Sequence, residues 1–213
     1  LDPVKVVITN YPEDKAEILD ASYNDYEEGF GSREVPFSRE IYIEKEDFRE
    51  EANKKFFRLK LGKEVRLKNA YIIKAESCTK DDEGNITEIQ CTYDPLSKSG
   101  SGTEESTRKV KGTLHWVSLK HAIKAEVRSY DRLFSDEAPD SHKDIDFMEF
   151  LNPNSLEVIN AFLEPSLQTA SIGERFQFQR LGYFNVDDDT TSGSLVFNKT
   201  VGLRDNWTAK QNK

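Results

Sequence analysis

The chain has 213 residues, of which 36% are hydrophobic and 32% charged, and its formal net charge at pH 7 is −9. This length suffices for one large or two small domains with cores of their own, and the charged fraction predicts a strongly solvated surface. No apolar run approaches the roughly 20 residues that a membrane-spanning helix needs, so the sequence predicts no such helix.

The termini and the cysteines indicate the setting of the chain. Leu1 is not a start methionine, and the single methionine is Met148, so we expect a piece of a longer protein. The N-terminus has no secretory-signal pattern, and we expect a cytoplasmic protein. Cys78 and Cys91 flank a predicted turn and could approach each other across a hairpin. Without a sign of secretion, we expect them to be reduced packing residues.

Alternating apolar and polar residues predict strands along most of the chain. The segments with this pattern are EIYIE (40–44), EVRLKNAYIIKAE (64–76), NITEIQCTY (85–93), VKGTLHWVSL (110–119) and RFQFQRLGYF (175–184). Residues typical of turns separate them, in DDEGN (81–85), SKSGSGTEEST (97–107) and DDDTTSG (187–193). One short helix is predicted over 46–56, because Phe48, Ala52 and Phe56 recur there at helical spacing.

These elements predict an all-β fold, mainly β with a short helix. Short strands broken by turns favour barrels or sandwiches over a parallel α/β sheet. The polar stretch 94–109 is the best candidate for a boundary. We therefore predict a first β-barrel over residues 1–109 and a second over 110–213, with the alternative that the C-terminal strands return to the first barrel.

Positive charge is concentrated in two parts of this acidic chain. Residues 49–74 hold nine Lys or Arg against three Glu, and residues 108–128 hold six basic residues against one acidic. Acidic residues collect elsewhere, near the N-terminus and over 135–149. The sequence therefore predicts a concentrated basic face on an acidic protein.

The predicted strand 65–75 indicates how this face would be built. Its odd-numbered apolar residues would point into the core, whereas Arg66, Lys68 and Lys74 would point the other way, with Arg58 shortly before the strand. Two interpretations stay open. The face is either a solubilising surface or an RNA-binding surface, since Lys and Arg neutralise phosphates and Arg can bind a base edge with paired donors.

Aromatic residues lie among these cations. Phe56 and Phe57 precede Arg58, and Tyr71 and Trp116 lie within the two basic segments. Exposed aromatic rings can stack on unpaired bases. We expect most of these four residues to belong to the core instead, as aromatic residues in strands usually do.

The segment RFQFQR (175–180) raises a question of parity. Phe176 and Phe178 share one face of a strand and leave Gln177 on the other, but Arg180 has the parity of the phenylalanines. A regular strand would bury Arg180, so we expect a bulge or a strand end before it. Gln amides can bind base edges, although Gln on an exposed strand is usually plain polar surface.

Signals for catalysis, cofactors or metals are weak. His115, His121 and His142 have no metal-ligand spacing with Cys or carboxylates. GSGTEEST lacks the Lys-Ser/Thr ending of a phosphate-binding loop, and DDDTTSGS lacks the twelfth-position Glu of a calcium loop. We expect no catalytic residue, cofactor site or metal site in this chain.

Several segments together carry a family resemblance. They are LDPVKVVI, GSREVPFSREIYIEKEDFREEANKKFFRLKLGKEVRLKNAYIIKAE, VKGTLHWVS, YDRLF and the closing FNKTVGLRDNW. Recurring in this order over nearly the whole chain, they resemble the C-terminal anticodon-binding region of bacterial glutaminyl-tRNA synthetase, which makes the match far more specific than any single motif above.

The resemblance implies two β-barrels of the type found in a ribosomal 5S-RNA-binding protein, with the three anticodon bases held in separate pockets between them. It also implies an N-terminal class I catalytic domain in the parent enzyme. The ATP-binding His-Ile-Gly-His and Lys-Met-Ser-Lys-Ser type motifs of that domain do not occur in this sequence. We therefore expect the chain to be non-catalytic by itself, while its parent, with ATP and Mg²⁺ in the catalytic domain, joins glutamine to tRNA(Gln).

The resemblance also implies roles for individual residues. Arg58 corresponds to an arginine used for the last anticodon base. Arg66 corresponds to one used for the first base, with Lys68 beside it. Gln177 and Arg180 correspond to a pair around the central uracil. These five residues form the predicted anticodon-binding set.

The sequence departs from a close relative at several of these places. Lys68 stands where the relative has Arg, and Lys lacks the planar fork of Arg. Phe57 stands in place of Lys, Lys55 in place of Gln and Gln179 in place of Glu. No residue of 23–28 aligns with an Asn that the relative contributes to the anticodon loop, and a further arginine of the central pocket lies upstream of Leu1 in the family.

Two other interpretations remain open. The glutamyl-tRNA synthetase of archaeal and eukaryotic type resembles these barrels and differs in its catalytic domain. A structural or interaction β-protein that does not bind RNA would have the same basic faces merely solvated, and would show no salt-sensitive RNA binding. On the main interpretation we expect a monomer whose partners are the anticodon loop of tRNA(Gln) and the parent's catalytic domain.

Overall fold

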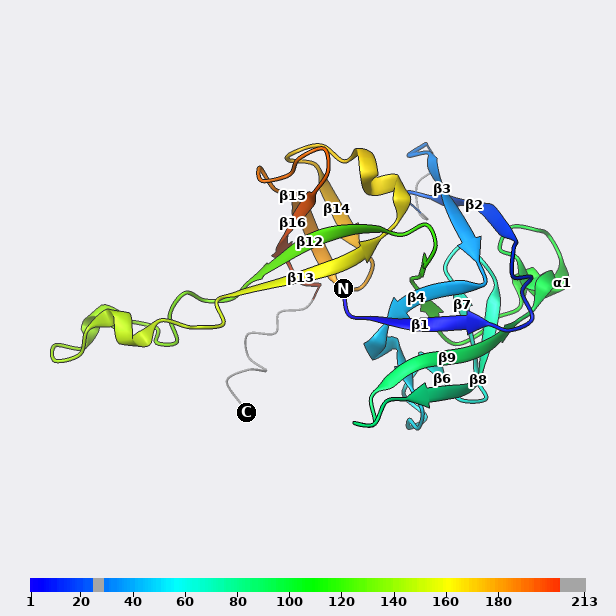
Figure 1. Cartoon of the computed structure of the whole chain (residues 1–213), viewed down its shortest axis with the longest axis horizontal. Coiled ribbons are helices and arrows are strands. Elements are labelled where there is room, and N and C mark those ends of the chain that lie inside the picture. The colour runs from blue at the N-terminus through cyan, green and yellow to red at the C-terminus, as the bar shows by residue number, and fades with distance from the viewer. Residues whose placement is uncertain (25–28, 204–213) are drawn as a thin grey trace. The chain divides into compact units, whose positions relative to one another are not determined.

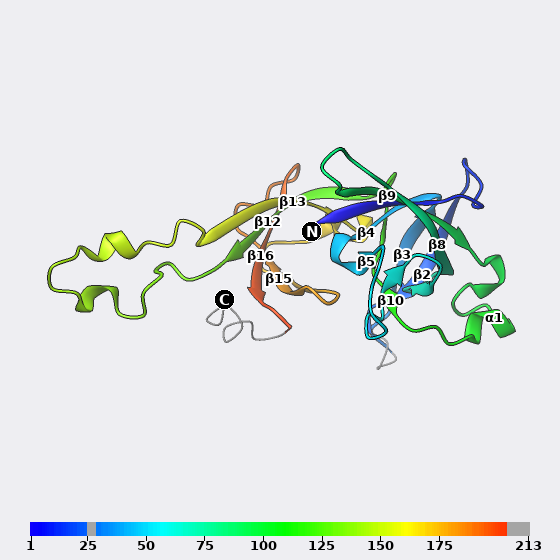
Figure 2. The ribbon, with the colours of Figure 1, turned by 90° about the horizontal axis from the view of Figure 1, so that it is seen from below.

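The computed structural model describes residues 1–24 and 29–203. The chain forms two compact units (Figure 1, Figure 2). Unit 1 comprises Leu1–Ile123 and Phe162–Thr169, and unit 2 comprises Lys124–Ala161 and the chain from Ala170 on.

Strands dominate both units, which confirms the predicted all-β class. Those of unit 1 are β1 (Pro3–Ile8), β2 (Ala16–Ser22), β3 (Ser32–Ser38), β4 (Glu40–Glu44), β5 (Phe48–Arg49), β6 (Leu59–Lys60), β7 (Glu64–Leu67), β8 (Ile72–Lys80), β9 (Ile86–Tyr93), β10 (Thr113–Leu114) and β11 (Val117–Ser118). The strands β12 (Ile123–Tyr130) and β13 (Leu156–Leu163) lead into and out of unit 2, which also holds β14 (Arg175–Phe178), β15 (Gly182–Val186) and β16 (Leu195–Val201).

Helical segments are short. They are the α-helix α1 (Glu104–Thr107) and the 3₁₀ turns η1 (Lys45–Asp47), η2 (Pro95–Ser97), η3 (Pro139–Ser141), η4 (Phe147–Phe150) and η5 (Pro165–Thr169). Within the described ranges, no helix has the length and apolar character to cross a membrane.

The main sheet of unit 1 curls on itself. It has seven strands in the order β10-β7-β8-β9-β1-β4-β11. Laid flat, such a sheet would hold its two edge strands about 30 Å apart. Yet β10 and β11 are consecutive in the chain and are separated by His115 and Trp116 alone, a connection that spans only about 10 Å. The two edges must therefore lie close together, which agrees with the barrel predicted for this part of the chain.

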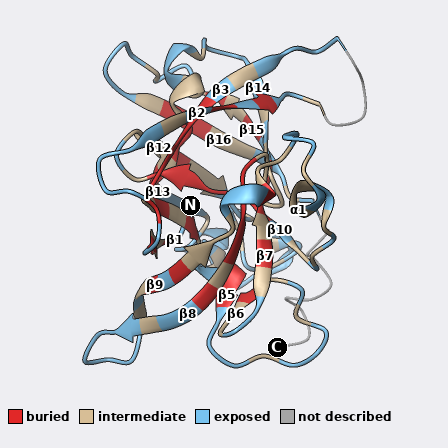
Figure 3. Ribbon diagram, turned by 90° about the vertical axis from the view of Figure 1, so that its right-hand side faces the viewer, coloured by how far each residue is buried: buried red, intermediate tan, exposed pale blue. Residues whose placement is uncertain are grey.

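Most of the buried hydrophobic residues of unit 1 form one cluster, to which the strands of this curled sheet contribute (Figure 3). Strands β1 and β4 bury every second residue, as the alternation of EIYIE predicts. Phe37 packs edge-on against Tyr11 at 5.1 Å and against Trp116 at 5.0 Å between ring centroids. Trp116 and Tyr71 are buried, so these two aromatic residues of the basic segments belong to the core, as expected.

Unit 2 is built on one five-stranded sheet in the order β13-β12-β16-β15-β14. Its buried centre is aromatic, with Phe184 and Phe197 both fully buried. The ring of Phe178 stacks on that of Phe184 with a centroid distance of 4.2 Å. Between β12 and β13 the chain runs out through η3 and η4 in a long excursion from the sheet (Figure 1).

The helix predicted over 46–56 is wrong. Residues 45–47 form η1, and β5 then pairs in parallel with β6. Phe48 reaches the core through this pairing, while the ring of Phe56 lies 4.9 Å from the guanidinium carbon of Arg49. Helical spacing of three apolar residues was thus too weak a signal, because tertiary contacts satisfy each of them separately. The α-helix that the structure describes, α1, lies instead in the Ser/Gly-rich stretch.

Three predicted strands are each divided into two strands. The segment 64–76 divides into β7 and β8 around Lys68–Tyr71, where Asn69 has a positive φ of 57°. Asn tolerates this left-handed conformation better than most residues. The segment 110–119 divides into β10 and β11, and 175–184 into β14 and β15. The alternation of apolar and polar residues continues across each of these interruptions, so the pattern did not indicate where one strand ends and the next begins.

The two units divide the chain at other positions than the predicted split between residues 109 and 110. Strands β10 and β11 pair with β7 and β4, inside unit 1. Residues 162–169 also return to unit 1. The C-terminal strands β14, β15 and β16 pair with one another and, through β16, with β12.

The cysteines are both free, as predicted. The register of the β8–β9 hairpin places Cys78 opposite Ile89 and Cys91 opposite Ala75. Cys91 is fully buried and burial raises its pKa to about 12. It is therefore an unreactive packing residue.

Candidate nucleic-acid interface

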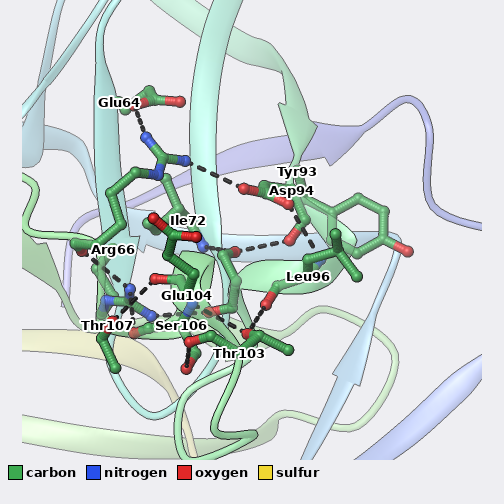
Figure 4. A network of polar contacts seen from close by, with 12 residues as sticks. Glu64, Arg66, Ile72, Tyr93, Asp94, Leu96, Thr103, Glu104, Ser106 and Thr107 are labelled. Carbon is green, nitrogen blue, oxygen red and sulfur yellow. Dashed lines mark hydrogen bonds and ion pairs between the residues drawn. The ribbon is translucent and has the colours of Figure 1, made fainter.

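Arg66 on β7 donates several hydrogen bonds to the segment 97–108 (Figure 4). Its Nη1 donates to the Ser97 carbonyl at 2.9 Å and to Ser99 Oγ at 3.2 Å. Its Nη2 donates to the Ser106 carbonyl at 2.9 Å and to the Arg108 carbonyl at 3.4 Å. Both Nη atoms thus hold the segment 97–108 against β7. Burial, followed by the charge of Arg108, lowers the pKa of Arg66, which nevertheless stays protonated.

A second arginine fixes the same segment from its other end. Arg108 donates from Nη1 to Glu64 at 2.5 Å and from Nη2 to Asp94 at 3.1 Å. Hydrogen bonds to these carboxylates raise the pKa of Arg108. Ser97 Oγ, on the segment itself, accepts from the Ile72 amide at 2.8 Å. The polar stretch 94–109, predicted as a boundary, is therefore bound to unit 1 next to Arg66.

Lys68 follows β7 in the turn to β8. Its amide donates to the Leu114 carbonyl at 2.9 Å, and its carbonyl accepts from the indole Nε1 of Trp116 at 2.9 Å. The backbone at Lys68 is therefore tied to the segment that closes the barrel. The side chain is partly exposed at this edge.

Arg58 lies in the loop between β5 and β6. Its Nη1 donates to the Glu46 carbonyl at 3.0 Å and lies 3.1 Å from the Glu46 carboxylate. Its Nε lies 3.3 Å from Oδ1 of Asp47, a residue with no exposed surface. A buried carboxylate needs a positive partner. Arg58 therefore stabilises the buried Asp47 in addition to any contact with a ligand.

Gly112 brings the two arginine-bearing segments together. A Cβ at this position would lie 2.2 Å from the Phe57 carbonyl oxygen, and the φ of +106° also favours glycine. The carbonyl of Gly112 accepts from the Arg66 amide at 3.1 Å. The loop that carries Arg58 and the strand that carries Arg66 therefore lie on either side of one residue, and unit 1 gathers Arg58, Arg66 and Lys68.

Gln177 and Arg180 lie in unit 2, at the β14–β15 hairpin. The strand β14 ends at Phe178, and the Leu181 amide donates to the Phe178 carbonyl at 2.9 Å to close a turn. Arg180 lies in this turn with a φ of 66°, so the expected strand end before it is confirmed. Gln177 is exposed, on the face opposite the phenylalanines. The positive φ of a non-glycine residue marks local strain at this position.

The histidines have partners within the protein. His115 Nε2 lies 3.0 Å from Glu164, His121 Nδ1 lies 2.8 Å from Ser118 Oγ, and His142 lies 3.3 Å from Asp136. Among the described residues, no group of three His, Cys, Asp or Glu side chains could hold a metal ion.

Sequence reasoning missed a cluster around Glu164, in the segment that returns to unit 1. Arg33 donates from Nε at 2.5 Å and from Nη2 at 2.9 Å to its two carboxylate oxygens, and His115 adds a third contact. Burial alone would raise the pKa of Glu164, but the hydrogen bonds from Arg33 and His115 lower it to about 2. The three residues come from distant parts of the chain, so no local pattern indicated them.

Comparison with known families settles what kind of domain carries these residues. Two family models, both described as "tRNA synthetases class I (E and Q), anti-codon binding domain", match residues 1–94 and 113–187. The chain belongs to this anticodon-binding family. The first match includes Arg58, Arg66 and Lys68, and the second includes Gln177 and Arg180. The roles of these five residues at individual bases stay predictions.

Curated relatives of the anticodon-binding chain carry one common name. A "Glutamine--tRNA ligase" from Rhodopirellula baltica is 55% identical over 208 residues, which is 97% of this chain and 34% of the relative. Those from Pseudoalteromonas atlantica and Vibrio parahaemolyticus are 54% and 53% identical over 97% and 100% of this chain, and 37% and 38% of their own lengths. The chain thus spans little more than a third of the relatives that it matches.

Two predicted features of the family region fall partly outside the described residues. Of the unaligned segment 23–28, the structure describes only Tyr23 and Asn24. The closing motif FNKTVGLRDNW is described up to Leu203.

Proposed function

We propose that this chain is the anticodon-binding part of a glutamine–tRNA ligase and that its ligand is the anticodon loop of tRNA(Gln). The observation that carries this proposal is the identity of 53–55% to proteins of that name over 97–100% of the chain. The gathering of Arg58, Arg66 and Lys68 in unit 1 supports it, because cations can bind phosphates and base edges.

In this proposal the two units read different parts of the anticodon. Arg58 serves the last base, and Arg66 with Lys68 serves the first. Gln177 and Arg180 serve the central uracil. Both Nη atoms of Arg66 already donate to carbonyl oxygens of the segment 97–108. To bind a base edge with paired donors, Arg66 must therefore break its hydrogen bond to the Ser97 or the Ser106 carbonyl.

The whole enzyme supplies the chemistry. Its catalytic domain would bind ATP and Mg²⁺ and join glutamine to the tRNA, while the present chain contributes recognition and no catalytic residue. We further propose that the enzyme works in the cytoplasm as a monomer and that the chain's protein partner is this catalytic domain.

A glutamate-specific enzyme is the second candidate. The matching family models cover both amino acids in their description, so the barrels alone do not separate the two. The names of the relatives favour glutamine. Binding to tRNA(Glu) therefore belongs in the test.

The test measures fluorescence anisotropy of labelled tRNA(Gln), of the same tRNA with the central anticodon uracil changed, and of tRNA(Glu), each at low and moderate salt. We expect the chain to bind unaltered tRNA(Gln) best at both salt concentrations. The variant Gln177→Ala should bind the unaltered and altered tRNA more equally, whereas the matched control Gln168→Ala, an exposed residue of η5, should discriminate like the wild type.

Other outcomes are informative. Equal binding of all three RNAs that fades steeply with salt would reduce the site to a phosphate-binding surface. Preference for tRNA(Glu) would favour the second candidate. The absence of any binding would contradict the proposal that this chain binds the anticodon.

A further inference from the structure

Phe57 is an aromatic residue placed unlike the buried aromatic residues of unit 1. Its side chain is 53% exposed, although it lies in the middle of the basic segment 49–74. A single exposed apolar residue is common on protein surfaces, so the groups around Phe57 decide whether its ring can bind a ligand.

A cation from a distant part of the chain lies over this ring. Lys111 Nζ is 5.6 Å from the ring centroid of Phe57, within the range of a cation–π contact. Lys111 is itself exposed and makes no ion pair with a described residue. Its charge is therefore available to an anion that approaches the ring.

The backbone fixes this arrangement. Gly112, next to Lys111, contacts the Phe57 carbonyl so closely that a Cβ would overlap it at 2.2 Å. The carbonyl of Gly112 accepts from the Arg66 amide at 3.1 Å. The backbones of Phe57 and Lys111 therefore lie close together beside β7, and Phe57 directly precedes Arg58 in the chain.

Arg58, the cation next to Phe57 in the chain, differs from Lys111 in having carboxylate partners. Arg58 is paired with the carboxylates of Glu46 and Asp47. Lys111 has no such carboxylate partner among the residues that the structure describes. The flat ring of Phe57 and the unneutralised charge of Lys111 therefore lie near the neutralised charge of Arg58. An unpaired nucleotide has the complementary chemistry, because its base offers a flat face and its phosphate a negative charge.

We propose that Phe57 and Lys111 form a stacking site for one unpaired base of the anticodon loop, in which the ring binds the base and the ammonium group its phosphate. This inference rests on the proposed function and extends it. Stacking accepts every base, so the site contributes affinity rather than specificity. In this respect it differs from the base-reading role proposed for Arg58.

The test compares alanine variants of two exposed phenylalanines in binding to tRNA(Gln). Phe57→Ala should weaken binding about 5- to 150-fold, the range for loss of one stacked base, with an unchanged slope of log affinity against log salt. Phe57→Tyr should restore binding. The matched control is Phe147→Ala in unit 2, where the phenylalanine is 47% exposed within an acidic segment, and it should bind like the wild type.

Lys111→Ala should have the opposite signature, a salt slope shallower by about one and a loss that shrinks as salt rises. In Phe57→Trp, in a Trp207→Phe background, stacking should quench the new indole fluorescence when RNA is added. Circular dichroism melting checks that each variant folds, which the exposure of Phe57 favours.

The failures of the two proposals are distinguishable. If the wild type binds tRNA and Phe57→Ala binds equally well without quenching in Phe57→Trp, the stacking site is overturned and the proposed function stands. If the wild type binds no tRNA, the proposed function is overturned and the stacking site with it.

Discussion

Units 1 and 2 hold their predicted RNA-binding residues in different ways. In unit 1, Arg66 is fixed by four hydrogen bonds to the segment 97–108, and Arg58 is fixed by a buried carboxylate. In unit 2, Arg180 lies in a turn with positive φ, and Gln177 is exposed on a strand. Substitutions of Arg66 and Arg58 in unit 1 should therefore change stability and binding together, whereas substitution of Gln177 in unit 2 should separate the two.

The segment 162–169 is the clearest example of this dependence in unit 1. Its neighbours on both sides belong to unit 2, yet it belongs to unit 1. Glu164, bound by Arg33 and His115, and Phe162, whose ring lies 4.7 Å from that of Tyr42, hold it there. The Glu164 carboxylate is largely buried, and a buried charge is stable only while its charged partners are present. The attachment of the segment therefore depends on every member of the cluster.

Glu164→Ala should have the largest effect on this comparison. Removing the carboxylate leaves Arg33 without its buried partner, so we expect the free energy of unfolding to fall by about 3–5 kcal/mol. Guanidinium unfolding followed by Trp116 fluorescence, in a Trp207→Phe background, reports on unit 1. The control is Glu157→Ala on β13, where the side chain is exposed and the loss should stay below about 0.5 kcal/mol. Equal losses would remove the contrast between the units.

Acid should weaken the same cluster. The pKa of Glu164 is lowered to about 2 from an ordinary 4.5, so its contribution is complete above about pH 4.5 and disappears as the pH falls towards 2. The shift corresponds to about 3 kcal/mol of unfolding free energy. Unfolding curves of the wild type and Glu164→Gln between pH 5 and 2 isolate this contribution, which the variant should lack. Parallel pH profiles would contradict the assignment.

Arg66→Lys should have an intermediate effect. Lys keeps the charge but cannot replace the planar fork that serves four acceptors, so we expect a loss of about 1–3 kcal/mol. Amide hydrogen exchange should show faster exchange over 97–108. The control is Arg175→Lys, an exposed position of β14, with a loss below about 0.5 kcal/mol. Unchanged exchange over 97–108 would show that Arg66 does not hold the segment.

Gln177→Ala should have the smallest effect on stability. The side chain is exposed on β14, so the free energy of unfolding should change by less than about 0.5 kcal/mol. Thermal unfolding followed by circular dichroism measures this. A larger loss would mean that Gln177 is structural, and the separation of stability from binding in unit 2 would fail.

Local pattern was sufficient for the class of fold and for some of its strands. The segment EIYIE coincides with β4, and NITEIQCTY contains β9. Period-two alternation records which face of a strand is buried, and that is a property of neighbouring residues. The order of the quoted segments likewise indicated the anticodon-binding family, since such a match depends on sequence alone.

Pattern failed wherever distant residues decide the outcome. The predicted helix 46–56 gave way to β5 and β6 because Phe48 finds its partner across a loop. The division of 64–76 depends on how Asn69 turns. Nothing around Arg66 indicated that its guanidinium would bind the segment 97–108.

The sequence thus specified the all-β class, the family and the types of residue at the interface, because alternation, turn chemistry and segment order are local properties. Only the tertiary structure decided that Arg66 is bound by the protein's own loop, that Glu164 attaches a returning segment to unit 1, and that Lys111 lies over Phe57. Each of these contacts joins residues that are far apart in the chain. Which residues meet depends on how the sheet closes, and not on the sequence next to each residue.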